Sequence, residues 1–269
     1  MRRSGDSLAL CYHAVSPTWP ERYTVTPGAL ESQVRHLLRR GYRPVTFAEA
    51  VDAQPGERVV AITFDDAYRS VRERALPLLD RLGAPATVFA VSGFADAGAP
   101  VTTALGDWSG GPHEDELRSM GWEELRELAD SGWEVGSHTR SHPMLTRLSD
   151  DELRDELVAS RSACEAGVGR PCRSLAYPYG DFDARVAEAA AAAGYERAAT
   201  LFGGQPAQPD ALEWPRVAIN RHHSPRAFRL KAAPAVRRAR TRPAAIALLE
   251  MAMRLSGRTP AARPSREAA

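Results

Sequence analysis

The sequence predicts an α/β fold, a distorted (β/α) barrel of seven or eight parallel strands that forms a single domain. Three observations support this prediction. A chain of 269 residues with 43% hydrophobic residues can bury a core of the size that one barrel needs. Short apolar runs alternate with helical patterns, which is typical of parallel strands joined by right-handed crossovers. Seven or eight such units favour a closed ring over an open sheet.

Eight apolar runs have the length and composition of strands. In chain order they cover residues 7–12, 43–46, 58–64, 85–91, 133–137, 173–177, 196–201 and 215–219. Helical patterns lie between most of them, at residues 27–40, 67–82, 122–131, 150–166 and 182–193. The first helix carries clear start and stop signals, because Thr26 is its expected N-cap, Pro27 takes the first helical position and Gly41 ends it.

Two stretches lie outside this repeating pattern. Residues 92–121 form a long Gly-rich connection, which in a compact domain is more often a lid or a binding loop than filler. Residues 243–255 have an amphipathic helical pattern, and the segment after them has the composition of a disordered chain. We therefore assign residues 1–232 to the barrel and residues 233–269 to a basic helix and a disordered tail.

The composition indicates in which cellular compartment the protein is expected and which binding partners it could have. The cysteines Cys11, Cys164 and Cys172 form no CxxC pair, so we interpret them as reduced thiols and expect a cytoplasmic protein. No apolar run is long enough to span a bilayer. Residues 221–269 contain 12 Lys or Arg and two acids, and contact with an anionic membrane is one hypothesis for this tail. A solvated tail explains it as well, and without interleaved aromatic residues no nucleic acid partner is expected.

Two adjacent acids, Asp65 and Asp66, follow the apolar run at residues 58–64. Like charges repel each other and resist burial, so their position needs an explanation. A solvated turn is one explanation. The other is a metal site that uses one acid as a ligand and the second as a base. The acidic pair at residues 150–151 differs, because Ser149 marks it as the start of a helix.

Two histidines, His138 and His142, follow the strand-like run at residues 133–137. Their spacing lets both imidazoles reach one metal ion, although a capped turn with a surface histidine gives the same spacing. The stronger argument is that the acids and the histidines follow different strands of the series, which brings them to the same mouth of a barrel. Two imidazoles and one carboxylate leave positions open on a divalent ion, as a hydrolase requires.

The segments TFDDAY, HTRSHP and YPYG resemble the first three motifs of the polysaccharide deacetylases, also called carbohydrate esterase family 4 or the NodB-homology domain. The resemblance extends over roughly residues 7–220. It implies a metal-dependent hydrolase that removes N-acetyl groups from an amino sugar in a poly- or oligosaccharide or a glycan precursor. The implied cofactor is one divalent ion, with Zn²⁺ as the default and Ni²⁺, Co²⁺, Fe²⁺ or Mn²⁺ as alternatives.

By position, the resemblance implies that Asp66, His138 and His142 bind the metal ion and that Asp65 is the general base. It also implies that the backbone N–H of Tyr179 stabilises an oxyanion.

Aromatic residues near these motifs are the candidates for contact with the sugar. Tyr68 and Trp108 offer flat faces to a sugar ring, and Tyr177 and Pro178 belong to the third motif. These four are the expected substrate-binding residues.

The third motif departs from the family pattern at one position. Members commonly carry an Arg at its start that orients the catalytic Asp, whereas this chain has Ala176 there. We prefer Arg216 as the substitute, reaching in from the next strand region. Arg173, or no replacement at all, is the alternative.

The family's last motif, an apolar strand that ends in a His, is absent from its usual C-terminal place. The N-terminal segment LALCYHAV has that form. Because the first strand of a closed barrel lies beside the last, a circularly permuted member could supply the acid that protonates the leaving amine from His13. His222 and His223 are rival candidates, and His13 could instead hydrogen-bond at the barrel rim.

Two further interpretations are consistent with the sequence. The chain could be a related amidase or an O-acetyl esterase, with the connection at residues 92–121 deciding the substrate. It could also be a carbohydrate-binding pseudoenzyme that keeps the fold without turnover.

Overall fold

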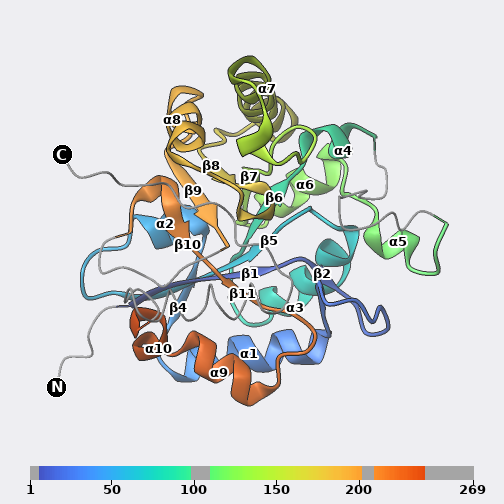
Figure 1. Cartoon of the computed structure of the whole chain (residues 1–269). Coiled ribbons are helices and arrows are strands. Elements are labelled where there is room, and N and C mark those ends of the chain that lie inside the picture. Colours follow the sequence, from blue (N-terminus) through green and yellow to red (C-terminus); the bar gives the residue numbers. More distant parts are fainter. Residues whose placement is uncertain (1–5, 98–109, 202–208, 240–269) are drawn as a thin grey trace, which may run out of the picture.

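A parallel sheet curls into a nearly closed wall, as the computed structural model shows for residues 6–97, 110–201 and 209–239 (Figure 1). Every pairing within this sheet is parallel, and the order of strands is β10-β9-β8-β7-β6-β5-β1-β11, with β4 pairing the first half of β5. The strands are β1 (Asp6–Tyr12), β4 (Arg43–Val45), β5 (Arg58–Phe64), β6 (Thr87–Ala90), β7 (Glu134–Ser137), β8 (Ser174–Ala176), β9 (Arg197–Thr200), β10 (Trp214–Pro215) and β11 (Val217–Ala218).

The ring closes through one short segment. β10 pairs with β9 and β11 pairs with β1, and Arg216 is the single residue between β10 and β11. The first strand therefore lies beside the last, as the sequence predicts for a closed barrel. The predicted fold class, a single-domain barrel of seven or eight parallel strands, is confirmed. A small separate sheet pairs β2 (Ala14–Val15) with β3 (Thr24–Val25).

Helices lie around this wall: the one at residues 47–51 packs Phe47 against Phe89 inside the barrel, and most of the others cover the outside (Figure 1). The helices are α1 (Pro27–Arg39), α2 (Phe47–Val51), α3 (Leu76–Asp80), α4 (Ser92–Ala97), α5 (Glu114–Leu117), α6 (Trp122–Asp130), α7 (Asp150–Val168), α8 (Ala184–Ala192), α9 (Pro225–Ala232) and α10 (Pro234–Ala239). A π-helical turn at Val71–Ala75 leads into α3, and 3-10 turns lie at Leu145–Arg147, Pro178–Gly180 and Ala211–Glu213. None of the helices in these ranges combines the length and apolar character that crossing a membrane requires.

The predicted helix signals operate as expected at two helices. The Thr26 hydroxyl accepts a hydrogen bond from the Ala29 N–H at 3.2 Å and caps α1. Ser149 and Glu152 form a capping box at the start of α7, which accounts for the acidic pair at residues 150–151. Asp150 and Asp151 also form exposed ion pairs with Arg185 and Arg154, and neither lies in the polar cluster at the strand ends.

Two predicted segments differ in detail. The helix expected at residues 67–82 begins only at residue 71, because Asp66 and Ala67 take left-handed backbone angles, with φ of 68° and 50°. The connection at residues 92–121 carries the short helices α4 and α5. Its middle part, the predicted helix at residues 243–255 and the tail after it lie outside the described residues, so the proposed boundary at residue 232 stays a prediction.

The layer between the sheet and the helices is apolar. The Trp133 and Phe64 rings stack with their centroids 5.8 Å apart, and both side chains are buried. Trp133 therefore belongs to the core. This rigid wall fixes the carboxyl ends of the strands, where the polar residues gather.

Candidate metal centre and active site

The polar residues singled out in the sequence meet at the carboxyl ends of the strands. Asp65 and Asp66 follow β5, His138 follows β7 and His13 follows β1. With Tyr179, which lies beyond β8, these side chains line one cavity of about 270 Å³. The prediction that separate strand ends supply a single mouth is confirmed.

Three buried side chains that could bind a metal ion converge in this cavity. The Asp66 Oδ1 atom lies 3.7 Å from His138 Nε2 and 3.5 Å from His142 Nε2. The ligand atoms of the three residues all lie within 4.8 Å of one another. Small shifts of these side chains would bring all three to the distances at which a divalent ion binds imidazole and carboxylate.

Strained backbone gathers around the same site. Four non-glycine residues there, Asp66, Thr139, His142 and Tyr179, have φ between 60° and 68°. Each left-handed residue of this kind costs about 1–3 kcal/mol and persists only where its surroundings hold it in place. The strain at Asp66 has a visible effect: the chain turns sharply there, so that two adjacent acids contact different partners.

The backbone around the two histidines is held by a buried acid on α7. The Glu156 carboxylate accepts hydrogen bonds from the backbone N–H groups of Arg140 and Ser141, both at 2.9 Å, and from the Ser141 hydroxyl. The Thr139 hydroxyl accepts from the His142 N–H at 3.1 Å. Glu156 is not recognisable from the sequence, since an acid inside a helix carries no local sign of such a contact.

Hydrogen bonds at the far side of each ring direct the imidazoles. His138 Nδ1 lies 2.7 Å from the Ala176 carbonyl oxygen, which can only accept, so Nδ1 carries the proton and Nε2 has a free lone pair. His142 Nδ1 lies 3.1 Å from the Tyr179 hydroxyl. If Nδ1 donates there, the Nε2 of His142 likewise keeps its lone pair for an ion.

The charge state of these groups suits a cation. Burial lowers the pKa of both His138 and His142 to about 4, so both imidazoles are neutral at pH 7. Burial also raises the pKa of Asp66. Within the described chain Asp66 Oδ1 accepts no hydrogen bond although it is buried. A divalent ion would satisfy this atom and both lone pairs, so the donor set fits a metal such as zinc.

Asp65 has a different partner. Arg216 donates to both of its oxygens, from Nη1 to Oδ1 at 2.6 Å and from Nη2 to Oδ2 at 2.8 Å, and Nη1 also donates to the Thr63 hydroxyl. Burial alone would raise the pKa of Asp65, but the positive charge of Arg216 outweighs it and holds that pKa well below its usual range. Arg173 instead pairs with Glu196 in a solvent-exposed position.

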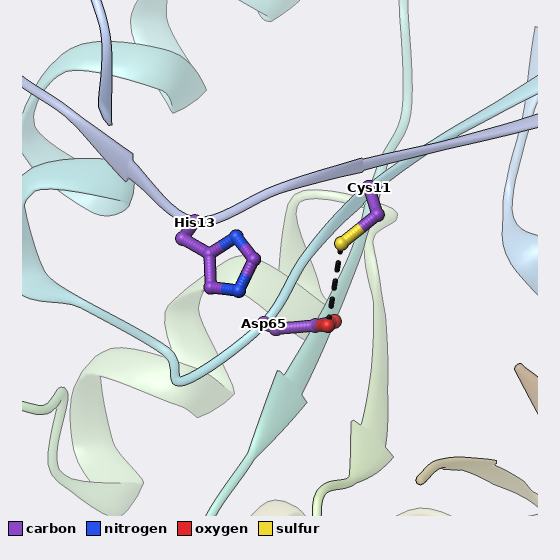
Figure 2. A group of neighbouring side chains, drawn as sticks. All are labelled: Cys11, His13 and Asp65. Atoms are coloured by element: carbon purple, nitrogen blue, oxygen red, sulfur yellow. Dashed lines mark hydrogen bonds between the residues drawn. The ribbon is translucent and has the colours of Figure 1, made fainter. Parts of the chain in front are cut away.

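Cys11 and His13 lie beside the same carboxylate (Figure 2). The Cys11 thiol donates to Asp65 Oδ2 at 3.3 Å, and donor atoms of Cys11, His13 and Asp65 lie within 4.8 Å of one another. We do not interpret this group as the metal centre, because Arg216 already occupies both oxygens of Asp65. Burial also raises the pKa of the Cys11 thiol, which therefore keeps its proton. Cys11 was missed as a site residue, although it lies two positions before His13.

His13 lies where the predicted acid should be. It lines the cavity, its Nδ1 has no hydrogen-bond partner among the described residues, and its ring packs 5.4 Å from that of Tyr23. Of the rivals, His223 accepts the Asn220 N–H and His222 is exposed, and neither lines the cavity. The geometry therefore favours His13, while circular permutation stays a prediction.

The predicted substrate contacts divide into two groups. Tyr68 lines the cavity, and its hydroxyl is hydrogen-bonded to the Asp66 carboxyl. The prediction was wrong for Tyr177 and Pro178, which are buried and face away from the cavity. The Tyr177 hydroxyl donates to the Leu212 carbonyl, and its ring stacks on Phe182 at 5.0 Å. Trp108 lies outside the described residues.

Comparison with known proteins assigns the family. The family model "Polysaccharide deacetylase" matches residues 52–198. The chain belongs to the polysaccharide deacetylase family. Its matched segment contains Asp65, Asp66, His138 and His142, whereas His13 and Arg216 lie outside it.

Individual relatives agree with this family. YxkH of Bacillus subtilis (strain 168), a protein assigned to the polysaccharide deacetylases, is 27% identical over 200 residues, which are 72% of this chain and 64% of YxkH. The poly-β-1,6-N-acetyl-D-glucosamine N-deacetylase of Escherichia coli (strain K12) is 31% identical over 140 residues, which are 49% of this chain and 20% of that enzyme. The chain thus spans less than two thirds of either relative.

A solved structure supports the fold. The Streptococcus pyogenes deacetylase PplD, in complex with acetate, superposes with a TM-score of 0.72 over 87% of this chain and all of that one. The two chains are 22% identical, so this likeness concerns the fold alone.

Proposed function

We propose that this polysaccharide deacetylase family member is a metal-dependent hydrolase that removes N-acetyl groups from an amino sugar in a poly- or oligosaccharide. One observation carries the proposal: Asp66, His138 and His142 converge in the same cavity as the Asp65–Arg216 pair. The name of the Escherichia coli relative supports an N-acetylated glucosamine polymer as the first substrate to test.

The proposed mechanism assigns one task to each group. Asp66, His138 and His142 hold one divalent ion, with Zn²⁺ as the first candidate. When bound, the ion supplies positive charge that acidifies water and polarises the acetamide carbonyl.

The other residues move protons and stabilise charge. Asp65, kept ionised by Arg216, accepts the proton of the attacking water. His13 gives a proton to the leaving amine nitrogen, so that the C–N bond breaks to acetate and a free amine. The Tyr179 backbone N–H stabilises the negative charge on the former carbonyl oxygen.

Acetate release tests this proposal. Purified protein is stripped of metal, reloaded with Zn²⁺ or with Co²⁺, Ni²⁺, Fe²⁺ or Mn²⁺, and incubated with oligomers of N-acetylglucosamine and with acetyl esters. We expect acetate from the amide substrates only after reloading, and none from Asp66→Asn. The control Asp150→Asn makes the same change at a side chain that is 88% exposed and should keep full activity.

Each other outcome favours another function. Cleavage of esters alone would indicate an O-acetyl esterase, and cleavage of a non-carbohydrate amide alone a related amidase. Sugar binding by metal-loaded protein without acetate release would indicate a pseudoenzyme. Activity that is unchanged in Asp66→Asn would refute the proposed metal centre.

A further inference from the structure

A second cavity, of about 260 Å³, lies at the opposite end of the barrel from the catalytic cavity. Its walls come from the last turns of α1 and α9 and from the starts of β4 and β5. In a (β/α) barrel these are the amino-terminal ends of strands and the carboxyl ends of helices. The two helices lie side by side there (Figure 1), and the rings of His36 and Phe228 are 6.2 Å apart.

The cavity is lined by three arginines and a histidine. They are His36 and Arg40 at the end of α1, Arg58 at the start of β5 and Arg229 in α9. Among the described residues no Asp or Glu lines it. The nearby acid Asp6 is engaged elsewhere, because its carboxylate bonds to the Tyr42 hydroxyl and to Arg237.

Arg58 is fixed at the wall of the cavity. Its Nη1 donates to the Arg40 carbonyl oxygen at 2.9 Å, and its guanidinium lies 5.0 Å from the centre of the Tyr42 ring. Its Nε is buried and has no hydrogen-bond partner within the ranges that the structure covers. A buried donor without an acceptor is costly, and it marks a place where an anionic oxygen would be stabilised.

Helix electrostatics explain only part of this arrangement. Cations near the carboxyl end of a helix are stabilised by the helix dipole, which suffices for His36 and Arg229. It also acts on Arg58, whose Nη1 donates to the carbonyl of Arg40, the C-cap of α1, but it leaves the buried Nε of Arg58 without an acceptor among the described residues. Burial lowers the pKa of His36, and the positive charges of Arg229, Arg40 and Arg39 lower it further. The cations therefore repel one another, and an anion between them would relieve this repulsion.

We propose that this basic cavity binds a phosphate group. Guanidinium groups match phosphate oxygens by paired hydrogen bonds, and three arginines suit an anion with several oxygens better than a single carboxylate. The volume is below the range of about 300–1,000 Å³ that is usual for drug-sized ligands, as expected for a phosphate or a lipid headgroup. The catalytic cavity opens at the other end of the barrel, so a phosphate-bearing surface bound here would leave it accessible.

Titration of the full-length chain with inorganic phosphate at constant ionic strength tests the proposal. We expect one saturable site by calorimetry and a perturbed His36 ring signal by NMR. The variant Arg40→Gln/Arg229→Gln, which changes two exposed side chains, should weaken binding about tenfold or more. The control Arg35→Gln/Arg154→Gln removes the same charge from exposed ion pairs with Glu31 and Asp151, and it should bind as the unaltered chain does.

A second arm identifies the source of the phosphate. Both variants are sedimented with phosphatidylcholine vesicles that do or do not contain phosphatidylglycerol. If only the cavity variant loses binding to the anionic vesicles, the ligand is a lipid phosphate; if both variants sediment alike but differ toward phosphate, it is a free phosphate group. The proposal is overturned if the unaltered chain binds no phosphate, or if the cavity variant binds it as well as the control. None of these results depends on deacetylase activity.

Discussion

Arg216→Met removes the guanidinium group that pairs with a fully buried acid. The side chains of Arg216 and Asp65 are 0% and 1% exposed, so water cannot replace the lost contact. Two short hydrogen bonds to the carboxylate and one to the Thr63 hydroxyl disappear together. Asp65 is left as a buried charge whose side chain keeps, among the described residues, the weak Cys11 thiol as its hydrogen-bond donor.

The expected loss of stability is large. Breaking a buried ion pair by removing one partner costs about 3–5 kcal/mol, whereas exposed pairs contribute about 0–1 kcal/mol. The matched control is Arg154→Met, because Arg154 and its partner Asp151 are 73% and 88% exposed. The double variant Arg216→Met/Asp65→Asn removes the uncompensated charge, so it should be more stable than Arg216→Met alone.

Urea unfolding of the metal-free protein measures these differences in the free energy of unfolding. The difference from the unaltered chain should also depend on pH. Arg216 holds the pKa of Asp65 below its usual range, so the pair stabilises the fold above about pH 4 and loses this effect as the pH falls. In Arg216→Met burial raises that pKa instead, so the defect is largest near neutral pH and shrinks on acidification. An effect as small as that of Arg154→Met, or a double variant no more stable than the single one, would refute the reasoning.

Three further predictions concern the metal centre. Glu156→Ala should weaken zinc binding about 10–100-fold, because two backbone N–H groups beside the histidines lose their acceptor. Asp151→Ala, an exposed change on the same helix, should leave zinc binding unchanged, and competition with a chelator measures the affinity of both variants. The metal-free protein should lose stability as pH falls from about 6.5 to 4, since His138 and His142 are buried neutral with pKa lowered to about 4 and bind protons on unfolding; a flat profile in urea unfolding would contradict this. Asp66→Asn should stabilise the metal-free protein by about 1–3 kcal/mol and abolish the rise in melting temperature on adding Zn²⁺, and a variant that still responds to Zn²⁺ would disprove the ligand role.

Local patterns were sufficient to locate the strands and most of the site. Apolar runs and caps depend on neighbours in the chain, so Asp65, Asp66 and the two histidines could be assigned to strand ends. The contact of Arg216 with Asp65 spans 151 residues and depends on how the ring closes, so the sequence left Arg173 open as an alternative. Tyr177 was misassigned because it was judged by its place in the third motif, whereas strand alternation sends its side chain to the same face as Leu175, between the sheet and the helices.

Asp65 and Asp66, the adjacent acids that follow β5, have different electrostatic environments. The left-handed turn at Asp66 sends the two carboxylates in different directions, so they do not need to share a partner. Asp65 is neutralised within the fold by Arg216, and its pKa falls; Asp66 faces two neutral imidazoles, and its pKa rises. Arg216 cannot serve both, because its two terminal nitrogens are committed to Asp65 and Thr63. Among the described residues no Lys or Arg pairs with Asp66, and the two imidazole lone pairs beside it favour the proposed metal ion over an ammonium or guanidinium group as its partner.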